Sequence, residues 1–247
     1  LFLAGGIDFE AGAGPGDARG GDAFEPLPGT ATEVAALAEI GRHEGLAVTV
    51  ASGAAADKKT VTAAIAAARY VHLATHGFFF QERAGAQGRG LNPGEVRAAD
   101  RNPLVESGIA LAGANVRDIT TQEASGLLTA EEIVGLDLSG CAMITLSACD
   151  TGRGEETTGQ GVLGLRSACL AGGAGSLVMS LWTVPDESTE ILMQAFYTGL
   201  WRGHLPPALA LRRAQETVRD DPSGSFADPI HWAGWAMVFI GLIVLNE

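Results

Sequence analysis

The sequence has few cysteines, and their spacing restricts where and how they can act. Cys141, Cys149 and Cys169 are the only three in 247 residues, and none of them forms a CxxC pair. A disulfide-stapled secreted domain would have more cysteines, in an even number, so the pattern is typical of a chain kept in a reducing compartment. We therefore expect a cytoplasmic protein. Cys141, at the start of a strand pattern, and Cys169, in an apolar helix pattern, are expected to be buried thiols without a catalytic role.

Basic residues are also scarce. Sixteen Lys and Arg stand against 29 Asp and Glu, which gives a net charge of −13. A groove that follows nucleic-acid phosphates needs clustered Lys and Arg, so we expect no nucleic-acid partner. Cationic ligands or polypeptides are favoured by this charge balance instead.

The sequence lacks an apolar run long enough to cross a membrane. The longest nearly unbroken one, residues 234–245, is shorter than the roughly 20 residues that a spanning helix needs, and we expect it to be a buried strand. The opening LFLAGGIDF has neither a basic n-region nor a cleavage site of a signal peptide. Because the chain begins with Leu, we expect residues 1–247 to be a single domain that forms the C-terminal part of a longer protein.

Strand and helix patterns alternate along most of the chain. Strands are predicted at 46–52, 70–75, 107–115, 141–149, 174–182 and 235–244, and helices at 30–45, 57–69, 128–136, 161–173, 186–203 and 206–220. In the short helix at 128–136, Thr129 and Glu132 are spaced as a capping box. Alternation of this kind predicts an α/β sandwich with a mostly parallel sheet of about six strands. Residues 78–103, rich in Gly, Arg and Asn, are predicted to be a long mobile loop.

Two reactive side chains follow predicted strands. VHLATHG, at 71–77, brings His76 to a strand end, and MITLSACDTG, at 143–152, does the same for Cys149. Functional groups gather at the carboxyl ends of parallel strands, so His76 is expected to face Cys149. A thiol beside an imidazole is the minimum set for nucleophilic acyl transfer. Backbone N–H groups at Gly77 and in the glycine-rich turn after Cys149 can face a developing oxyanion.

Several longer stretches resemble the CHAT domain, a caspase-like cysteine peptidase module often attached to TPR repeats. They are YVHLATHGFF, NPLVESGIALAGAN, GLLTAEEIVGLDLSG, the long stretch from LSACDTGRGEE to ILMQAFY, and PPALALRRAQ, and the resemblance covers about 27–241. It implies a three-layer α/β/α sandwich and an endopeptidase related to caspases and separases, with a polypeptide substrate and a role in bacterial signalling or defence. His76 matches the family's histidine and Cys149 its nucleophile. The N–H groups of Gly77 and Cys149 would form the oxyanion hole, and a TPR or other helical-repeat region would precede Leu1.

Residues of the substrate pocket are predicted after the strand at 174–182. In caspase-like folds this strand leads into pocket residues, so Trp182 and Asp186 are candidates there. Asp150, Glu155 and Glu156 lie close in sequence to Cys149, so we expect a preference for Arg or Lys before the scissile bond. The competing interpretation is that Trp182 belongs to the core and Asp186 caps the next helix beside Pro185.

Other functions have weaker support in the sequence. GQGVLG, at 159–164, has the spacing of a dinucleotide fingerprint but does not directly follow a strand, and we expect no cofactor. His72 and His76 on one strand would be about 13 Å apart, too far to share a metal ion, so no metal site is predicted and His72 is expected to pack within the sheet. The principal alternative to a peptidase is a catalytically inactive signalling or scaffold module on the same fold.

Overall fold

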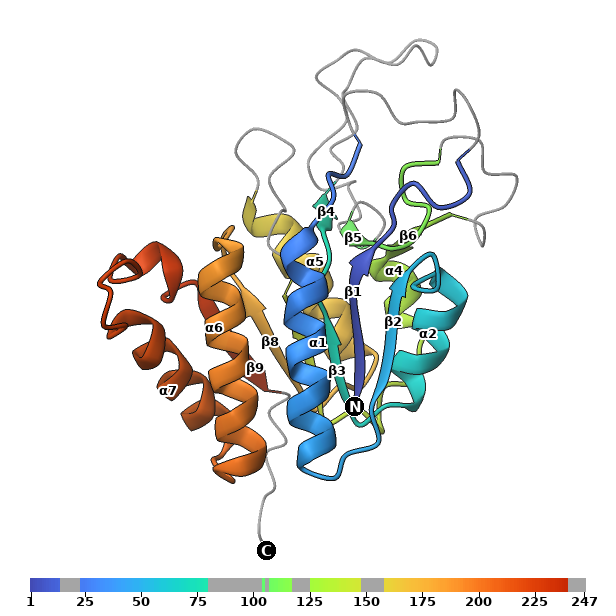
Figure 1. The fold of residues 1–247 in the computed structure, drawn as a ribbon. Helices are drawn as coiled ribbons and strands as arrows, with labels where there is room; N and C mark the ends of the chain where they lie inside the picture. The colour runs from blue at the N-terminus through green and yellow to red at the C-terminus, as the bar shows by residue number, and fades with distance from the viewer. Residues whose placement is uncertain (14–22, 80–103, 105–106, 117–124, 148–157, 240–247) are drawn as a thin grey trace, which may run out of the picture.

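A six-stranded sheet lies between two layers of helices in the computed structural model (Figure 1). The structure describes residues 1–13, 23–79, 104, 107–116, 125–147 and 158–239, and of 158–163 the backbone alone. The sheet has the order β2-β1-β3-β7-β8-β9, and its strands are parallel except for β9. Its strands are β1 (Phe2–Ile7), β2 (Thr49–Gly53), β3 (Tyr70–Leu73), β7 (Met143–Leu146), β8 (Ser176–Ser180) and β9 (Trp235–Phe239). This architecture confirms the predicted α/β/α sandwich.

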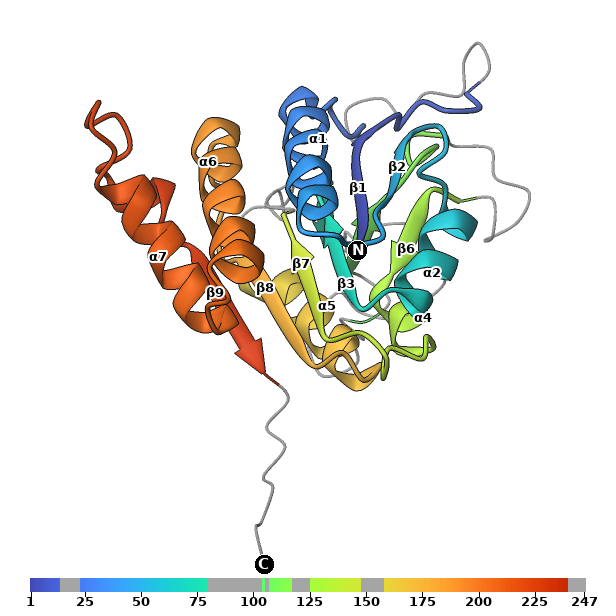
Figure 2. The same ribbon diagram turned by 60° about the horizontal axis from the view of Figure 1, so that its bottom comes forward.

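Each face of the sheet has its own layer of helices (Figure 2). On one face lie α1 (Pro28–His43), α6 (Asp186–Tyr197) and α7 (Pro207–Arg219), and on the other α2 (Lys58–Ala67), α4 (Ala130–Val134) and α5 (Thr158–Ala171). A π-helical turn (Thr198–Arg202) extends α6, and a short 3-10 helix (Pro229–His231) precedes β9. Alternate strand residues serve the two cores, because successive side chains of a strand point to opposite faces. Met143 packs with the α1 and α6 layer, whereas Ile144 packs with the α5 layer.

Local sequence signals account for several helix boundaries. The Asp57 side chain accepts a hydrogen bond of 2.7 Å from the backbone N–H of Thr60 at the start of α2. At α4 the predicted capping box is confirmed, since the Thr129 side chain accepts from the Glu132 N–H and the Glu132 carboxylate accepts from the Thr129 N–H. Both arrangements satisfy backbone donors that a helix start leaves without intrahelical partners.

A second, antiparallel sheet of order β4-β5-β6 adjoins the α5 side of the sandwich. It contains β4 (Gly77–Phe79), β5 (Ser107–Ala110) and β6 (Leu127–Thr129). The sequence prediction was wrong in two details here: residues 78 and 79 belong to β4 and not to a loop, and the strand near 107 is not part of the main sheet. The remainder of the predicted loop, residues 80–103, lies outside the described residues.

The first strand of the chain, β1, and the last described strand, β9, both belong to the main sheet. Strand β1 was not predicted, because Gly5 and Gly6 interrupt its apolar pattern and glycine weakens a strand signal. Gly5 is required by close packing, since a Cβ there would lie 2.7 Å from the carbonyl oxygen of Thr30 in α1. Of the buried strand expected at the C-terminal end, residues 235–239 form β9, which is an edge strand, and residues 240–245 lie outside the described residues. In β9 Trp235 alone is buried, and Phe239 is 53% exposed.

Among the helices in the described part of the chain, none combines the length and hydropathy needed to cross a bilayer.

Candidate active site

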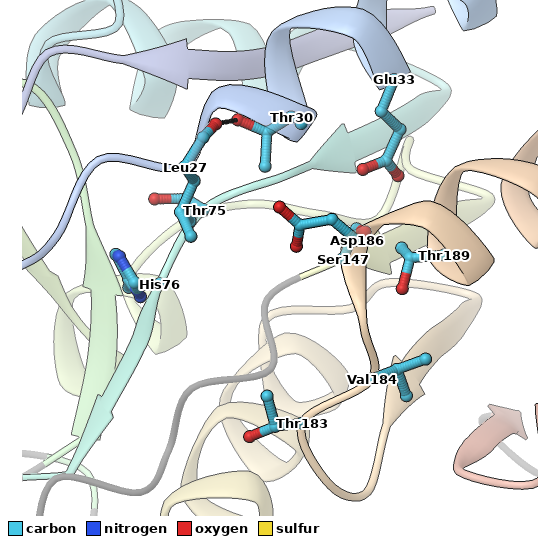
Figure 3. A pocket seen from close by; sticks show the side chains of 11 residues that line it. Leu27, Thr30, Glu33, Thr75, His76, Ser147, Thr183, Val184, Asp186 and Thr189 are labelled. Carbon is cyan, nitrogen blue, oxygen red and sulfur yellow. Dashed lines mark hydrogen bonds between the residues drawn. The ribbon is translucent and has the colours of Figure 1, made fainter. Parts of the chain in front are cut away.

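A cavity of about 120 Å³ opens at the carboxyl ends of the parallel strands (Figure 3). Its lining comes from segments that follow β1, β3, β7 and β8: Leu27, Gly29, Thr30, Glu33, Thr75, His76, Ser147, Thr183, Val184, Asp186 and Thr189. The strand order reverses next to β1, because β2 lies on one side of it and β3 on the other. Ligand sites of parallel sheets lie at such points, outside the carboxyl ends of the strands.

The imidazole of His76 is held by the chain segment that precedes α1. Only 5% of His76 is exposed, and its ring lies 5.2 Å from the ring of Phe9 and 5.6 Å from that of Phe24, centroid to centroid. Its Nε2 is 2.7 Å from the carbonyl oxygen of Glu25, which can only accept, so the N–H at Nε2 donates. A neutral ring then has its basic lone pair at Nδ1. The sequence does not reveal these contacts, because a loop has no periodicity that would place it over a strand end.

The backbone at His76 is fixed by β5. The N–H of Ala110 donates to the His76 carbonyl oxygen at 2.9 Å, and the Thr75 hydroxyl donates to the carbonyl oxygen of Ala110. Gly77 follows as the first residue of β4 and is paired with Ile109. The main chain therefore turns from one sheet into the other at His76, which explains why the strand ends there.

The neighbouring strand, β7, runs parallel to β3 toward the same cavity. Leu73 and Leu146 are paired in the register, and the Ser147 N–H donates to the Leu73 carbonyl oxygen at 2.9 Å. Ser147 lines the cavity together with His76. Cys149 is the third residue after Leu146, as His76 is the third after Leu73. Cys149 lies outside the described residues, and so do Asp150, Glu155 and Glu156.

The two pocket candidates after β8 differ in their surroundings. Asp186 lines the cavity, and a Cβ on Gly29 would lie 2.8 Å from its Oδ2, so the carboxylate sits against the first turn of α1. It does not cap α6, whose N-cap is Pro185 with no side-chain hydrogen bond. Trp182 does not line this cavity; it is 37% exposed, so it is not a core residue either. Its indole N–H donates to the Ile230 carbonyl oxygen at 3.1 Å.

The two described cysteines are buried away from this cavity, as predicted. Cys141 and Cys169 are each 2% exposed and belong to the α5-side core. Burial raises the pKa of both thiols, that of Cys169 to about 12. Because the thiolate is the nucleophile, neither is suited to catalysis near neutral pH.

Comparison with known proteins identifies the family. The family model for the CHAT domain matches residues 13–241. This chain belongs to the CHAT domain family. The six-stranded, mostly parallel sheet with helices on both faces is the caspase-like sandwich that the sequence resemblance implied.

Relatives of this CHAT chain include two mammalian proteins named for a repeat. Human Tetratricopeptide repeat protein 28 is 27% identical over 220 residues, which are 86% of this chain and 8% of the relative. The mouse protein of the same name is 33% identical over 112 residues, 45% of this chain and 4% of the relative. The chain thus spans less than a tenth of the length of these relatives, both of which are repeat-containing proteins by name.

Proposed function

We propose that this CHAT domain is a cysteine endopeptidase that cleaves polypeptides with Cys149 as nucleophile and His76 as its partner. The observation that carries the proposal is the setting of His76. Its imidazole is fixed at a cavity by the Glu25 carbonyl, just after the strand that pairs with the one leading to Cys149. A buried histidine with an oriented ring, at the mouth of a cleft, can transfer a proton to a group bound there.

The proposed reaction proceeds through an acyl-enzyme. The Cys149 sulfur attacks the scissile carbonyl carbon as a thiolate, and a C–S bond forms while the carbonyl oxygen takes up negative charge. The N–H groups of Gly77 and Cys149 are proposed to bind this oxyanion. The C–N bond then breaks as protonated His76 gives a proton to the leaving amine. Water attacks the thioester in the second half, which releases the acid and restores the thiol.

The lining of the cavity favours a substrate side chain with positive charge. Glu33 and Asp186 contribute carboxylates to its wall, while its other polar side chains are hydroxyls and the His76 imidazole. A cationic side chain would meet opposite charge in a region partly screened from water, where such pairing is strongest. We therefore propose Arg or Lys before the scissile bond, with Asp186 and Asp150 in the pocket.

The setting of the domain is also proposed. The mammalian relatives carry a tetratricopeptide repeat in their names. We propose that a helical-repeat region or partner precedes this chain and presents its substrate, and that the protein acts in the cytoplasm in bacterial signalling or defence.

A cleavage assay with matched variants tests the proposal. Fluorogenic peptide amides that vary the residue before the scissile bond are incubated with the chain, with Cys149→Ala and with Cys169→Ala. We expect cleavage after Arg or Lys by the unaltered chain and by Cys169→Ala, and none by Cys149→Ala. Equal rates for Cys149→Ala would refute the nucleophile, and no cleavage by any form, together with an unreactive Cys149 thiol, would favour the scaffold alternative.

A further inference from the structure

Four buried polar side chains form a continuous row that begins at the cavity wall with Glu33. The Nε2 of His72 lies 3.0 Å from Oε1 of Glu33, and its Nδ1 lies 3.2 Å from the Tyr197 hydroxyl oxygen. The Tyr197 hydroxyl in turn donates to Oγ1 of Thr145 at 2.9 Å. His72, Thr145 and Tyr197 are each 0% exposed, and Glu33 is 3% exposed. The proposed reaction uses none of these groups as acid, base or nucleophile.

Each of the four side chains comes from a different element of the site. Glu33 belongs to α1, His72 to β3, Thr145 to β7 and Tyr197 to α6. His72 and Thr145 are register partners on the two neighbouring strands, so one hydroxyl of Tyr197 bridges a cross-strand pair. Four residues beyond His72 lies His76, and Ser147 is two residues beyond Thr145; both line the cavity.

The hydrogen bonds fix where two of the protons are, on the Tyr197 hydroxyl and on Nδ1 of His72. Burial raises the pKa of Tyr197, so its hydroxyl keeps its proton and donates it to Thr145. The Tyr197 oxygen must then accept from Nδ1–H of His72. Nε2 of His72 faces Oε1 of Glu33 across the remaining contact, so each of these two buried ionisable groups has the other as its partner. The two atoms are close, but they are not aligned as a linear hydrogen bond.

The fourth member, Glu33, connects this row of side chains to the cavity. Its carboxylate points into the cavity from α1, as Figure 3 shows, while Oε1 is buried against His72. The Glu33 side chain therefore contacts His72 of β3 on one side and can contact a molecule bound in the cavity on the other. A change in the spacing of β3 and β7 would move the cavity wall and His76 together.

We propose that Glu33, His72, Tyr197 and Thr145 form a positioning network that sets the spacing of β3 and β7 where these strands enter the active site. This inference rests on the proposed function. The four residues touch neither the sulfur nor the scissile bond in this account; they act through His76 and through the segment that leads to Cys149. The contribution of His72, Tyr197 and Thr145 is therefore to the rate of the chemical step and not to the affinity for substrate, whereas Glu33 also lines the proposed side-chain pocket.

Conservative substitutions of the bridging hydroxyls test the network. Tyr197→Phe keeps the ring that stacks on Trp201 and removes the hydroxyl, and Thr145→Val removes the other hydroxyl at nearly constant volume. We expect kcat for peptide cleavage to fall about 10-fold in each, with KM nearly unchanged, because small misplacements of reacting groups are costly in rate. Thr145→Ser, which keeps a hydroxyl, should restore most of the rate. Tyr70→Phe is the matched control on β3, and it should cleave at the unaltered rate.

A double-mutant cycle separates a network from independent losses of stability. The variant with both Tyr197→Phe and Thr145→Val should be no slower than either single variant, because each already breaks the same bridge. Multiplication of the two effects, or a fall in thermal stability with kcat unchanged, would overturn the proposal.

A second readout does not depend on peptide cleavage. The rate of Cys149 alkylation by iodoacetamide, measured against pH in the full chain, reports how the imidazole and the thiol are placed. We expect Tyr197→Phe and Thr145→Val to shift this pH profile, and Tyr70→Phe to leave it unchanged. If the unaltered chain cleaves no peptide but the profile shifts, the peptidase proposal fails and the network stands. If all profiles coincide, the network is refuted whatever the cleavage assay shows.

Discussion

At the scale of single residues, the two described cysteines have surroundings that keep their thiols from reacting. Cys141 and Cys169 are enclosed in the core, and burial raises the pKa of each. Cys149 follows a strand that ends at the cavity. One thiol per chain should therefore be chemically available, although the sequence has three.

Native alkylation tests that difference. Brief treatment of the folded chain with iodoacetamide at pH 7.5 should modify Cys149, while Cys141 and Cys169 react only after unfolding in guanidinium chloride. Peptide mass mapping before and after denaturation gives the result. Modification of Cys169 ahead of Cys149 under native conditions would contradict the assignment.

The buried thiols also give the stability a pH dependence. An unfolded cysteine loses its proton near its ordinary pKa of 9, whereas Cys169 in the folded chain holds it to about 12. Between these values the folded state binds more protons than the unfolded state, so the free energy of unfolding falls as pH rises. This contribution is complete below pH 9 and is lost through the interval up to 12. Urea denaturation at pH 8 and pH 10 should show a smaller decrease in Cys169→Ala than in the unaltered chain.

Buried Glu33 is expected to matter for stability as well as for rate. Glu33→Gln leaves His72 without its carboxylate partner at a site that is 0% exposed, and we expect a loss of at least about 2 kcal/mol in the free energy of unfolding. Glu39→Gln, an exposed position on the same helix, is the control and should change the stability by less than about 0.5 kcal/mol. Equal urea midpoints for the two variants would show that the pair does not contribute.

At the scale of elements, hydrophobic periodicity and capping residues predicted those helices and strands that are determined by local sequence. The helix at α4 was predicted with its capping box because Thr129 and Glu132 satisfy each other locally. Strand β1 was not predicted because its two glycines allow close packing against α1. Such a contact between distant segments produces no periodic pattern in the sequence. For the same reason, His76 was found from its strand end, but the Phe9, Phe24 and Glu25 contacts that hold it were not.

The close approach of β1 and α1 can be tested directly. Gly5→Ala would put a Cβ 2.7 Å from both the Thr30 carbonyl oxygen and Cγ1 of Val34, so a shift of backbone is required. We expect a loss of about 1–3 kcal/mol in the free energy of unfolding, as for other overpacked positions. Gly140→Ala, where nothing lies within 4 Å of the added atom, should be neutral. Chemical denaturation of both variants gives the comparison. An unchanged free energy of unfolding in Gly5→Ala would contradict the prediction, because it would mean that β1 and α1 move apart at little cost.

At the scale of the whole molecule, the sheet topology brings the site together. Residues that follow β1, β3, β7 and β8 are far apart in the sequence but line one cavity, because parallel strands end at the same edge. The layer of α1 and α6 closes this cavity, and both helices begin at it with Gly29 and Asp186 in contact. A parallel sheet therefore gathers a site that no local stretch of sequence contains.

The central claim is that Cys149 and His76 act on the same peptide bond. A crystal structure of the chain treated with a peptide aldehyde that ends in arginine tests it most directly. We predict a covalent bond between Cys149 Sγ and the aldehyde carbon, with Nδ1 of His76 within hydrogen-bond distance of the adduct and the arginine side chain in the cavity beside Asp186 and Glu33. An adduct whose sulfur lies on the opposite side of the sheet edge from His76 would contradict the account.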